Sequence, residues 1–371
     1  MAAALATVIG VLTVDLDAIV ANWRKLEKTA VPAECAGVIK ANAYGCGIAP
    51  VARALSAAGC KSFFVATLDE ARAARAALPA SAAIYVLSGL FQNSGDSFAK
   101  INCRPVIGDL NELAEWDVFC RHSGWSGGAA IQIDTGMNRL GLSVAEAQSL
   151  RPRIETGNHG ITLVMSHLVS SELINSPANA RQLATFRRVA SLFTGVPASL
   201  SNSSGVYLGA PFQFDMVRPG AALYGVNPTP GQPNPTLPVL ELKARIVQVR
   251  QLAQGESVAG SFGWTARRRT RLALLSVGYA DGYPRPANPA DTKLAAIVGG
   301  RRCPVVGRPS MDLLPVDVTD LPDPAAARYG EMATLIGAQV GIDELAAAAA
   351  SSGREVLSGL GHRFHRVYYA I

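Results

Sequence analysis

Apolar residues between about residues 15 and 225 fall into short runs separated by Ala-rich amphipathic stretches. The runs predict eight buried strands: Ala36–Lys40, Ser62–Thr67, Ala83–Ser88, Arg104–Ile107, Ala129–Asp134, Ile161–His167, Ala198–Asn202 and Phe214–Arg218. The stretches between them predict helices, among them Leu68–Ala77, Leu110–His122, Val144–Arg153 and Asn179–Phe193. Strands that alternate with helices form βαβ units and a parallel sheet. Eight of them in this length predict a (β/α)8 barrel.

The pattern changes after the Pro-rich segment Asn227–Pro238, which is typical of a linker. Short β runs with turns between them follow, at Leu240–Val249, Arg271–Val277, Lys293–Val298, Pro304–Val306, Leu313–Val318 and Glu331–Ile336. One helix, Ile342–Ala350, precedes a last strand at Arg366–Ile371. The predicted fold class is α/β, a TIM-type barrel followed by a mainly β domain. We expect the barrel over residues 12–230 and the second domain over 235–371, joined by an N-terminal strand at 1–11.

Composition narrows the range of functions. Hydrophobic residues make up 49% of the chain and charged residues 17%, a normal globular balance. The net charge is +6, but the basic residues are scattered apart from Arg267–Arg269, Arg271 and Arg301–Arg302, and no aromatic residues interleave with them. We therefore expect no nucleic-acid partner. The N-terminal residues 1–14 lack the basic start of a signal peptide and are too short to span a membrane, so we expect no membrane association.

The cysteines and histidines do not form a metal-binding pattern. Six cysteines lie far apart, with no CxxC pair and no zinc-ligand spacing. His362 and His365 form an HxxH near the C-terminus, but no cysteine or acidic cluster accompanies them. We expect no metal and interpret the cysteines as reduced thiols of a cytoplasmic protein.

Common nucleotide and hydrolase motifs are absent or incomplete. The segment Gly45–Pro50 partly resembles a dinucleotide GxGxxG fingerprint, but it ends in proline and lacks the acidic residue about 20 positions later. No GxSxG, Walker loop or HExxH occurs. Dinucleotide-binding proteins, NTPases and the common hydrolases are therefore disfavoured.

Polar residues follow several predicted strands: Lys40, Thr67, Asp134, His167, Ser203 and Arg218. In a barrel the carboxyl ends of the strands carry the chemistry. Lys40 is the most informative of these residues, because burial disfavours a lysine's charge and a neutral lysine can form a Schiff base with an aldehyde cofactor. The simpler interpretation is a lysine that only extends from a strand end into solvent. The cofactor-binding interpretation needs support from other residues.

Three loops supply that support. Asp134–Gly141 places an arginine in a Gly-bounded loop, and Asn202–Gly205 and Arg218–Gly220 follow the seventh and eighth strands. Barrels frequently bind phosphate at these last two positions. A hydroxyl, a glycine amide and small residues suit a phosphate cradle.

Seven segments in order resemble the signatures of the alanine racemase family: VIKANAYG, DTGMNRLG, MSHL, NSSG, MVRPGAALYG, GYADGYPR and GRPSMDLLPVDVTD, between residues 38 and 320. The resemblance covers nearly the whole chain. It implies a barrel followed by a β domain, the cofactor pyridoxal 5'-phosphate (PLP), and interconversion of L- and D-alanine, either to supply D-alanine for the cell wall or to use it in catabolism.

The resemblance also implies a role for each site residue. Lys40 would bind PLP covalently and act as acid and base on the substrate face presented by D-alanine. Phosphate binding would fall to Tyr44, Ser203, Gly220 and Ala221. Arg218 would face the pyridine nitrogen and keep it unprotonated, which favours simple proton exchange over side reactions. His167 would support that side of the ring.

Substrate binding is implied for three further residues. Arg139 would reach the cofactor phenolate and the substrate carboxylate. Met311 and Asp312 would come from the second subunit of a head-to-tail homodimer, with the Met311 amide near the substrate carboxylate, so that each active site is composite.

The chain departs from the family at the second proton-transferring residue. Racemisation needs a base on each face of the substrate, and the family uses a tyrosine before the GYADG motif. Here that position is Gly260, or Phe262 if two residues are deleted, and neither can move a proton. Smaller departures are Cys46, where a histidine often stands, and His362, near a phosphate-binding tyrosine. A third is Gln132, which replaces a carboxylated lysine and can bond Arg139.

Two alternatives remain open from the sequence, and a third is disfavoured. The protein could be a PLP enzyme of this fold with impaired racemisation, or a non-catalytic PLP-binding protein, although lone-barrel proteins of that kind lack the β domain. Related decarboxylases carry an acidic partner for the pyridine nitrogen and a C-terminal cysteine motif. Arg218 and the absence of cysteine after Cys303 argue against them.

Overall fold

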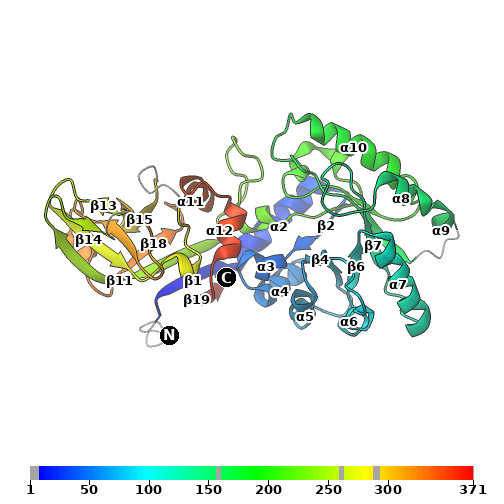
Figure 1. Ribbon diagram of the computed structural model, residues 1–371, viewed down its shortest axis with the longest axis horizontal. Coiled ribbons are helices and arrows are strands. Elements are labelled where there is room, and N and C mark those ends of the chain that lie inside the picture. The colour runs from blue at the N-terminus through cyan, green and yellow to red at the C-terminus, as the bar shows by residue number, and fades with distance from the viewer. Residues whose placement is uncertain (1–7, 156–159, 259–262, 287–292, 371) are drawn as a thin grey trace. The chain divides into compact units, whose positions relative to one another are not determined.

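The computed structural model describes residues 8–155, 160–258, 263–286 and 293–370. The chain divides into two compact units (Figure 1). One contains Ile19–Leu223 and Asn227–Leu237, and the other contains Met1–Ala18, Tyr224–Val226 and Pro238–Ile371.

The first unit is built on short parallel strands: β2 (Glu34–Cys35), β3 (Gly37–Val38), β4 (Ser62–Val65), β5 (Ala83–Val86), β6 (Arg104–Ile107), β7 (Ala129–Gln132), β8 (Ile161–Met165), β9 (Ala198–Ser199) and β10 (Met216–Val217). Strands β3 to β9 form one parallel sheet in sequence order, and β10 pairs in parallel with β2. Five of these strands are buried at every position: β3, β4, β7, β9 and β10. Burial on both faces explains why they appear in the sequence as continuous apolar runs.

Strand β10 closes this sheet into a barrel. On one side, Asp215 N donates to Ala198 O (3.0 Å) and Arg218 N donates to Ser201 O (2.9 Å), which joins β10 to the β9 segment. On the other side, Val38 N donates to Pro219 O (3.1 Å), next to the β2 pairing. The predicted (β/α)8 barrel is confirmed, with β2 and β3 as two parts of its first strand.

Helices occupy the connections: α2 (Leu16–Ala30), α3 (Lys40–Tyr44), α4 (Ile48–Ala58), α5 (Leu68–Arg75), α6 (Gly95–Ile101), α7 (Leu110–Ser123), α8 (Val144–Ser149), α9 (Arg151–Glu155) and α10 (Pro177–Ala190). Several begin where a side chain accepts a hydrogen bond from the first turn. Thr67 caps α5, Asp109 caps α7, and Ser143 with Glu146 forms a capping box on α8. Such caps position the loops at the strand ends.

The second unit contains the strands β1 (Gly10–Asp15), β11 (Leu240–Leu252), β12 (Ser257–Val258), β13 (Trp264–Thr265), β14 (Thr270–Leu275), β15 (Ala295–Val298), β16 (Arg301–Pro304), β17 (Leu314–Asp317), β18 (Met332–Ile336) and β19 (His365–Tyr369), and the helices α11 (Ile342–Ala348) and α12 (Gly353–Gly359). The long strand β11 organises it by pairing antiparallel with β1, β14 and β18. Along the first half of β11, buried and half-buried residues alternate, which is typical of a sheet with one covered face. The predicted mainly β domain is confirmed. Its first strand among the described residues, β1, overlaps the end of the expected N-terminal strand at residues 1–11, which otherwise stays a prediction.

In the described ranges, no helix has the length and apolar character needed to cross a membrane.

Candidate active site

Lys40 begins an unusual turn. The sequence predicts Lys40 as the last residue of a strand, but the strand ends two residues earlier. Strand β3 stops at Val38, and Ala41 to Tyr44 all have φ near +50°. Gly45 (φ 78°) ends this left-handed turn, and its N–H donates to Ala41 O (2.9 Å). Each non-glycine residue in this conformation costs roughly 1–2 kcal/mol. Consecutive strained residues beside a candidate catalytic lysine indicate a functional constraint.

The turn brings Tyr44 against the loop after β10. Tyr44 is buried, and a Cβ added to Gly220 would lie only 2.5 Å from the Tyr44 hydroxyl oxygen. Only glycine therefore allows the hydroxyl to approach this backbone so closely. The segments that follow β3 and β10 are distant in sequence, and they meet at the Tyr44 hydroxyl.

Ser203, after β9, reaches the same place. Its hydroxyl oxygen accepts hydrogen bonds from Gly220 N (2.9 Å) and Ala222 N (3.2 Å). Because the oxygen accepts both bonds, the hydroxyl hydrogen is available to an anion, and Ala221 lies between the two donors. The hydroxyls of Tyr44 and Ser203 thus meet at a short glycine loop and form a cradle of hydrogen-bond donors that suits a phosphate. The residues present therefore fit a phosphorylated cofactor.

Arg218 is a buried cation beside this cradle. Only 5% of its surface is exposed, its guanidinium donates to Ser199 Oγ and Ser166 O, and its central carbon lies 5.8 Å from the Phe64 ring centroid. Burial lowers the pKa of Arg218 to about 9, so the side chain remains charged at neutral pH. His167 follows Ser166 and is half-buried, and its carbonyl accepts from Gln182 Nε2 (2.9 Å).

The loop that carries Arg139 is folded around Asp134. One oxygen of this carboxylate, Oδ1, accepts from the backbone N–H groups of Gly136 (2.9 Å), Met137 (2.9 Å) and Asn138 (3.1 Å). Gln132 was expected to bond Arg139. In the structure its side-chain amide donates to the carbonyl of Leu140 (2.8 Å), the next residue. Arg139 itself is exposed in this chain.

Met311 and Asp312 lie in the second unit, against the turn that follows β14. Tyr279 N donates to Ser310 O (3.0 Å) and Ala280 N donates to Met311 O (3.1 Å). A Cβ on Gly278 would lie 2.3 Å from both of these carbonyl oxygens, so glycine is required for the close approach.

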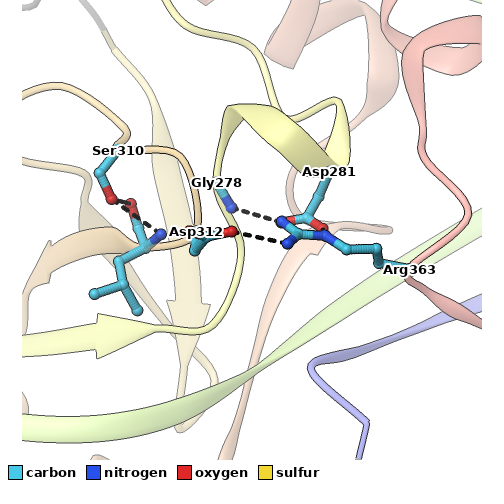
Figure 2. A network of polar contacts seen from close by, with 6 residues as sticks. Gly278, Asp281, Ser310, Asp312 and Arg363 are labelled. Carbon is cyan, nitrogen blue, oxygen red and sulfur yellow. Dashed lines mark hydrogen bonds and ion pairs between the residues drawn. The ribbon is translucent and has the colours of Figure 1, made fainter.

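An arginine ties these two segments together, as Figure 2 shows. Arg363 Nε donates to Asp281 Oδ1 (2.6 Å) and Arg363 NH1 donates to Asp312 Oδ1 (2.8 Å), while Asp281 is fully buried and also accepts from Gly278 N (2.9 Å). The two carboxylates raise the pKa of the Arg363 guanidinium. The sequence prediction missed this network. The available signals were Asp281 in GYADGYPR and an arginine in GHRFHR.

Two other sequence features have plain structural outcomes. The segment Gly45–Pro50, which partly resembles GxGxxG, includes the last residue of the left-handed turn and the start of α4. It therefore does not link a strand to a helix as a dinucleotide fingerprint does. Cys46 is fully buried. Gly260 and Phe262 lie outside the described residues.

The barrel, the phosphate cradle and the lysine beside it define a class, the (β/α)8-barrel enzymes that bind a phosphorylated aldehyde cofactor at the carboxyl ends of their strands. Comparison with known proteins identifies the family within this class. Residues 14–228 match the model of the alanine racemase N-terminal domain, and residues 239–368 match that of the C-terminal domain.

Individual relatives agree along almost the whole chain. The alanine racemase of Methylobacterium sp. (strain 4-46) is 51% identical over 96% of this chain and 97% of its own. That of Methylobacterium nodulans is 49% identical over 96% and 95%. The crystal structure of alanine racemase from Bartonella henselae with covalently bound pyridoxal phosphate is 35% identical, has a TM-score of 0.90, and covers 97% of this chain and 99% of its own.

The chain belongs to the alanine racemase family. Membership confirms three predictions from the sequence: an isomerase, the cofactor PLP, and the interconversion of alanine enantiomers.

Proposed function

We propose that this protein racemises alanine at the barrel site, with Lys40 as the residue that holds PLP covalently. The observation that carries this assignment is the left-handed turn, because it joins Lys40 to the phosphate cradle through Tyr44. When bound here, PLP would supply an electron-withdrawing ring that makes the α-proton acidic once the amino group of the substrate is linked to it.

The cradle would anchor the phosphate end of the cofactor. Tyr44 and Ser203 would donate hydroxyl hydrogens to phosphate oxygens, and the backbone at Gly220 and Ala221 would lie against them without a side chain large enough to intervene. Ser203 is itself held by two backbone N–H groups, so its oxygen cannot rotate away. This arrangement fixes the cofactor before any substrate binds.

Arg218 would hold the ring nitrogen of the cofactor. A guanidinium is a hydrogen-bond donor with no acceptor, and Arg218 stays charged, so it would donate to this nitrogen and leave it unprotonated. Its bonds to Ser199 and Ser166 hold the group over the Phe64 ring. His167 supports the same side. An unprotonated ring withdraws fewer electrons, which restricts the reaction to proton exchange.

Substrate orientation and proton transfer fall to the remaining residues. Arg139 binds the substrate carboxylate, and the Asp134 carboxylate keeps the Arg139 loop folded. Lys40 Nζ removes and returns the α-proton on one face. The second face depends on residues 259–263, where the family's tyrosine is missing from the sequence.

The enzyme acts as a cytoplasmic homodimer in which Met311 and Asp312 of one subunit complete the site of the other. Exposed apolar side chains support this proposal on both units: Leu140, Val169, Leu173 and Ile174 in barrel loops, and Tyr279, Met311 and Leu313 in the β unit. Clustered exposed apolar residues mark interaction surfaces. All six cysteines are free thiols, which supports a reducing compartment such as the cytoplasm.

Reduction of the holoenzyme with borohydride tests the assignment of Lys40. The treatment converts the Schiff base into a stable adduct, and peptide mapping then identifies the modified lysine. We expect the adduct on Lys40, its loss in Lys40→Ala, and its retention in Lys61→Ala, which removes an exposed lysine beside β4. An adduct that persists on another lysine in Lys40→Ala would contradict the proposal.

A further inference from the structure

Glu70 is bonded to the segment that carries Lys40. It occupies the third residue of α5, three positions after the cap Thr67. Its carboxylate contacts two backbone N–H groups that belong to different segments. Oε2 accepts from Ala66 N (2.7 Å), just after β4, and Oε1 accepts from Asn42 N (3.3 Å), two residues after Lys40.

The bond to Asn42 supplements the internal bonds of the left-handed turn. Within the turn, Ala43 N donates to Ile39 O (2.9 Å) and Gly45 N donates to Ala41 O (2.9 Å). The Asn42 N–H points to the Glu70 carboxylate instead, while the Asn42 side chain accepts from Ile48 N (2.9 Å) at the start of α4. A charged acceptor makes a stronger bond than a neutral one.

The turn needs such an external restraint. Ala41, Asn42, Ala43 and Tyr44 all lie in the left-handed region, where each costs roughly 1–2 kcal/mol. Strained conformations persist only where the surrounding structure over-determines them. Glu70 fastens the centre of the turn to the end of β4, the strand that pairs with β3.

We propose that Glu70 is a positioning residue for the cofactor lysine: its carboxylate holds the left-handed turn in place and so fixes where the Lys40 side chain enters the barrel. Glu70 touches neither cofactor nor substrate in this account. The inference rests on the proposed function, because it takes Lys40 as the residue that binds PLP.

The chain offers a matched control in Glu112. It is the third residue of α7, three positions after the cap Asp109, and its Oε2 accepts from Gly108 N (3.0 Å) after β6. Burial raises the pKa of Glu112, and backbone hydrogen bonds from Gly108 and Leu90 oppose that rise. Glu112 thus joins two segments as Glu70 does, but neither segment contains Lys40 or a left-handed turn.

The test compares Glu70→Gln with Glu112→Gln. Glutamine keeps one acceptor oxygen and turns an amide N–H₂ toward the other N–H group, so each variant loses one bond. Apoprotein of each is mixed with PLP, and covalent capture is followed by visible absorption and by borohydride trapping with peptide mapping. Urea unfolding of the same samples measures stability, and alanine turnover separates kcat from KM.

We expect similar losses of stability in the two variants but different capture rates. Capture at Lys40 should slow roughly 10- to 100-fold in Glu70→Gln alone, the scale of a reacting group misplaced by about 1 Å. Its kcat should fall while KM for alanine changes little. Capture as fast as in the unmodified protein, or an equal slowing in Glu112→Gln, would overturn the inference.

Amide hydrogen exchange on the unmodified protein gives a second test that does not depend on how the variants fold. The Asn42 N–H should be protected, and unprotected exchange at Asn42 would overturn the inference. An adduct mapped to a lysine other than Lys40 in the unmodified protein refutes the proposed function itself and is recognised before any variant is made.

Discussion

At the scale of single residues, the contact between Tyr44 and Gly220 sets the shape of the phosphate cradle. Gly220→Ala would place a carbon 2.5 Å from the Tyr44 hydroxyl oxygen, so one of the two segments must shift. Overpacking of this kind costs about 1–3 kcal/mol, and we expect a comparable loss of PLP affinity, roughly 10- to 100-fold. Equilibrium dialysis of the apoprotein against PLP measures it.

The double variant Gly220→Ala with Tyr44→Phe shows whether the loss of PLP affinity comes from this contact or from a general disturbance of the loop. Tyr44→Phe removes the hydroxyl that the new methyl group would meet, and the next nearest Tyr44 atom is 3.2 Å from the built carbon. The loss of affinity in the double variant should therefore be smaller than the sum of the two single losses. Additive losses would show that the contact does not explain the need for glycine.

Most candidate residues could be found from the sequence because they lie inside short, ordered motifs, but their contacts could not. Asp134 was only a polar residue at a strand end, and the structure shows it holding three backbone N–H groups. Glu70 gave no signal, and an arginine near the C-terminus gave no indication of its partners, because Glu70 and Arg363 each bond a segment far away in sequence. Long-range pairing of this kind depends on tertiary structure, which periodicity does not encode.

At the scale of elements, the left-handed turn after Lys40 makes a prediction about stability. Ala41 is exposed and has φ 52°, so a glycine there removes a steric cost of roughly 1–2 kcal/mol while adding about 0.5–1 kcal/mol of unfolded-state entropy. Ala41→Gly should leave the free energy of unfolding unchanged or raise it by up to about 1.5 kcal/mol.

Ala73 provides the control for this prediction. It is exposed like Ala41, but it lies inside the regular helix α5. Ala73→Gly should lower the free energy of unfolding by about 1 kcal/mol. Urea unfolding of both variants tests the difference, and an equal loss of stability in Ala41→Gly would show that the turn is not strained in solution.

The order and type of the main elements were predictable, whereas their ends were not. Arg104–Ile107 coincides with β6, but the other predicted barrel strands run one to three residues beyond the observed ones, as with Ala198–Asn202 against β9. The backbone leaves the sheet where polar side chains begin to organise loops. The left-handed turn was missed because alanine, asparagine and tyrosine carry no signal for positive φ. The limits 12–230 and 235–371 stay a prediction.

At the scale of the whole molecule, the composite site predicts complementation between inactive variants. One variant is Lys40→Ala and the other is Asp312→Ala, which removes the carboxylate that Arg363 binds. In a mixed dimer one site combines both defects and the other combines both intact residues. We expect each homodimer to be strongly impaired and confirmed heterodimers to regain about half of the unmodified activity per dimer, by the symmetry of a twofold dimer.

Heterodimers are isolated with two different affinity tags, and alanine racemisation is then assayed. A heterodimer no more active than the two homodimers would show that each site is completed within one chain.

The central claim is that this chain interconverts the two enantiomers of alanine. The most direct measurement follows both the loss of the α-proton and the formation of the opposite enantiomer. Holoenzyme is incubated in deuterium oxide with L-alanine and, separately, with D-alanine. Proton magnetic resonance measures loss of the α-proton, and chiral chromatography measures the opposite enantiomer. Each substrate should yield its mirror image, with α-deuterium incorporated. Because Gly260 or Phe262 replaces the family's tyrosine, exchange from L-alanine should be slower than from D-alanine, by up to roughly 10²- to 10⁴-fold. Exchange that never produces the opposite enantiomer from either substrate would contradict the account.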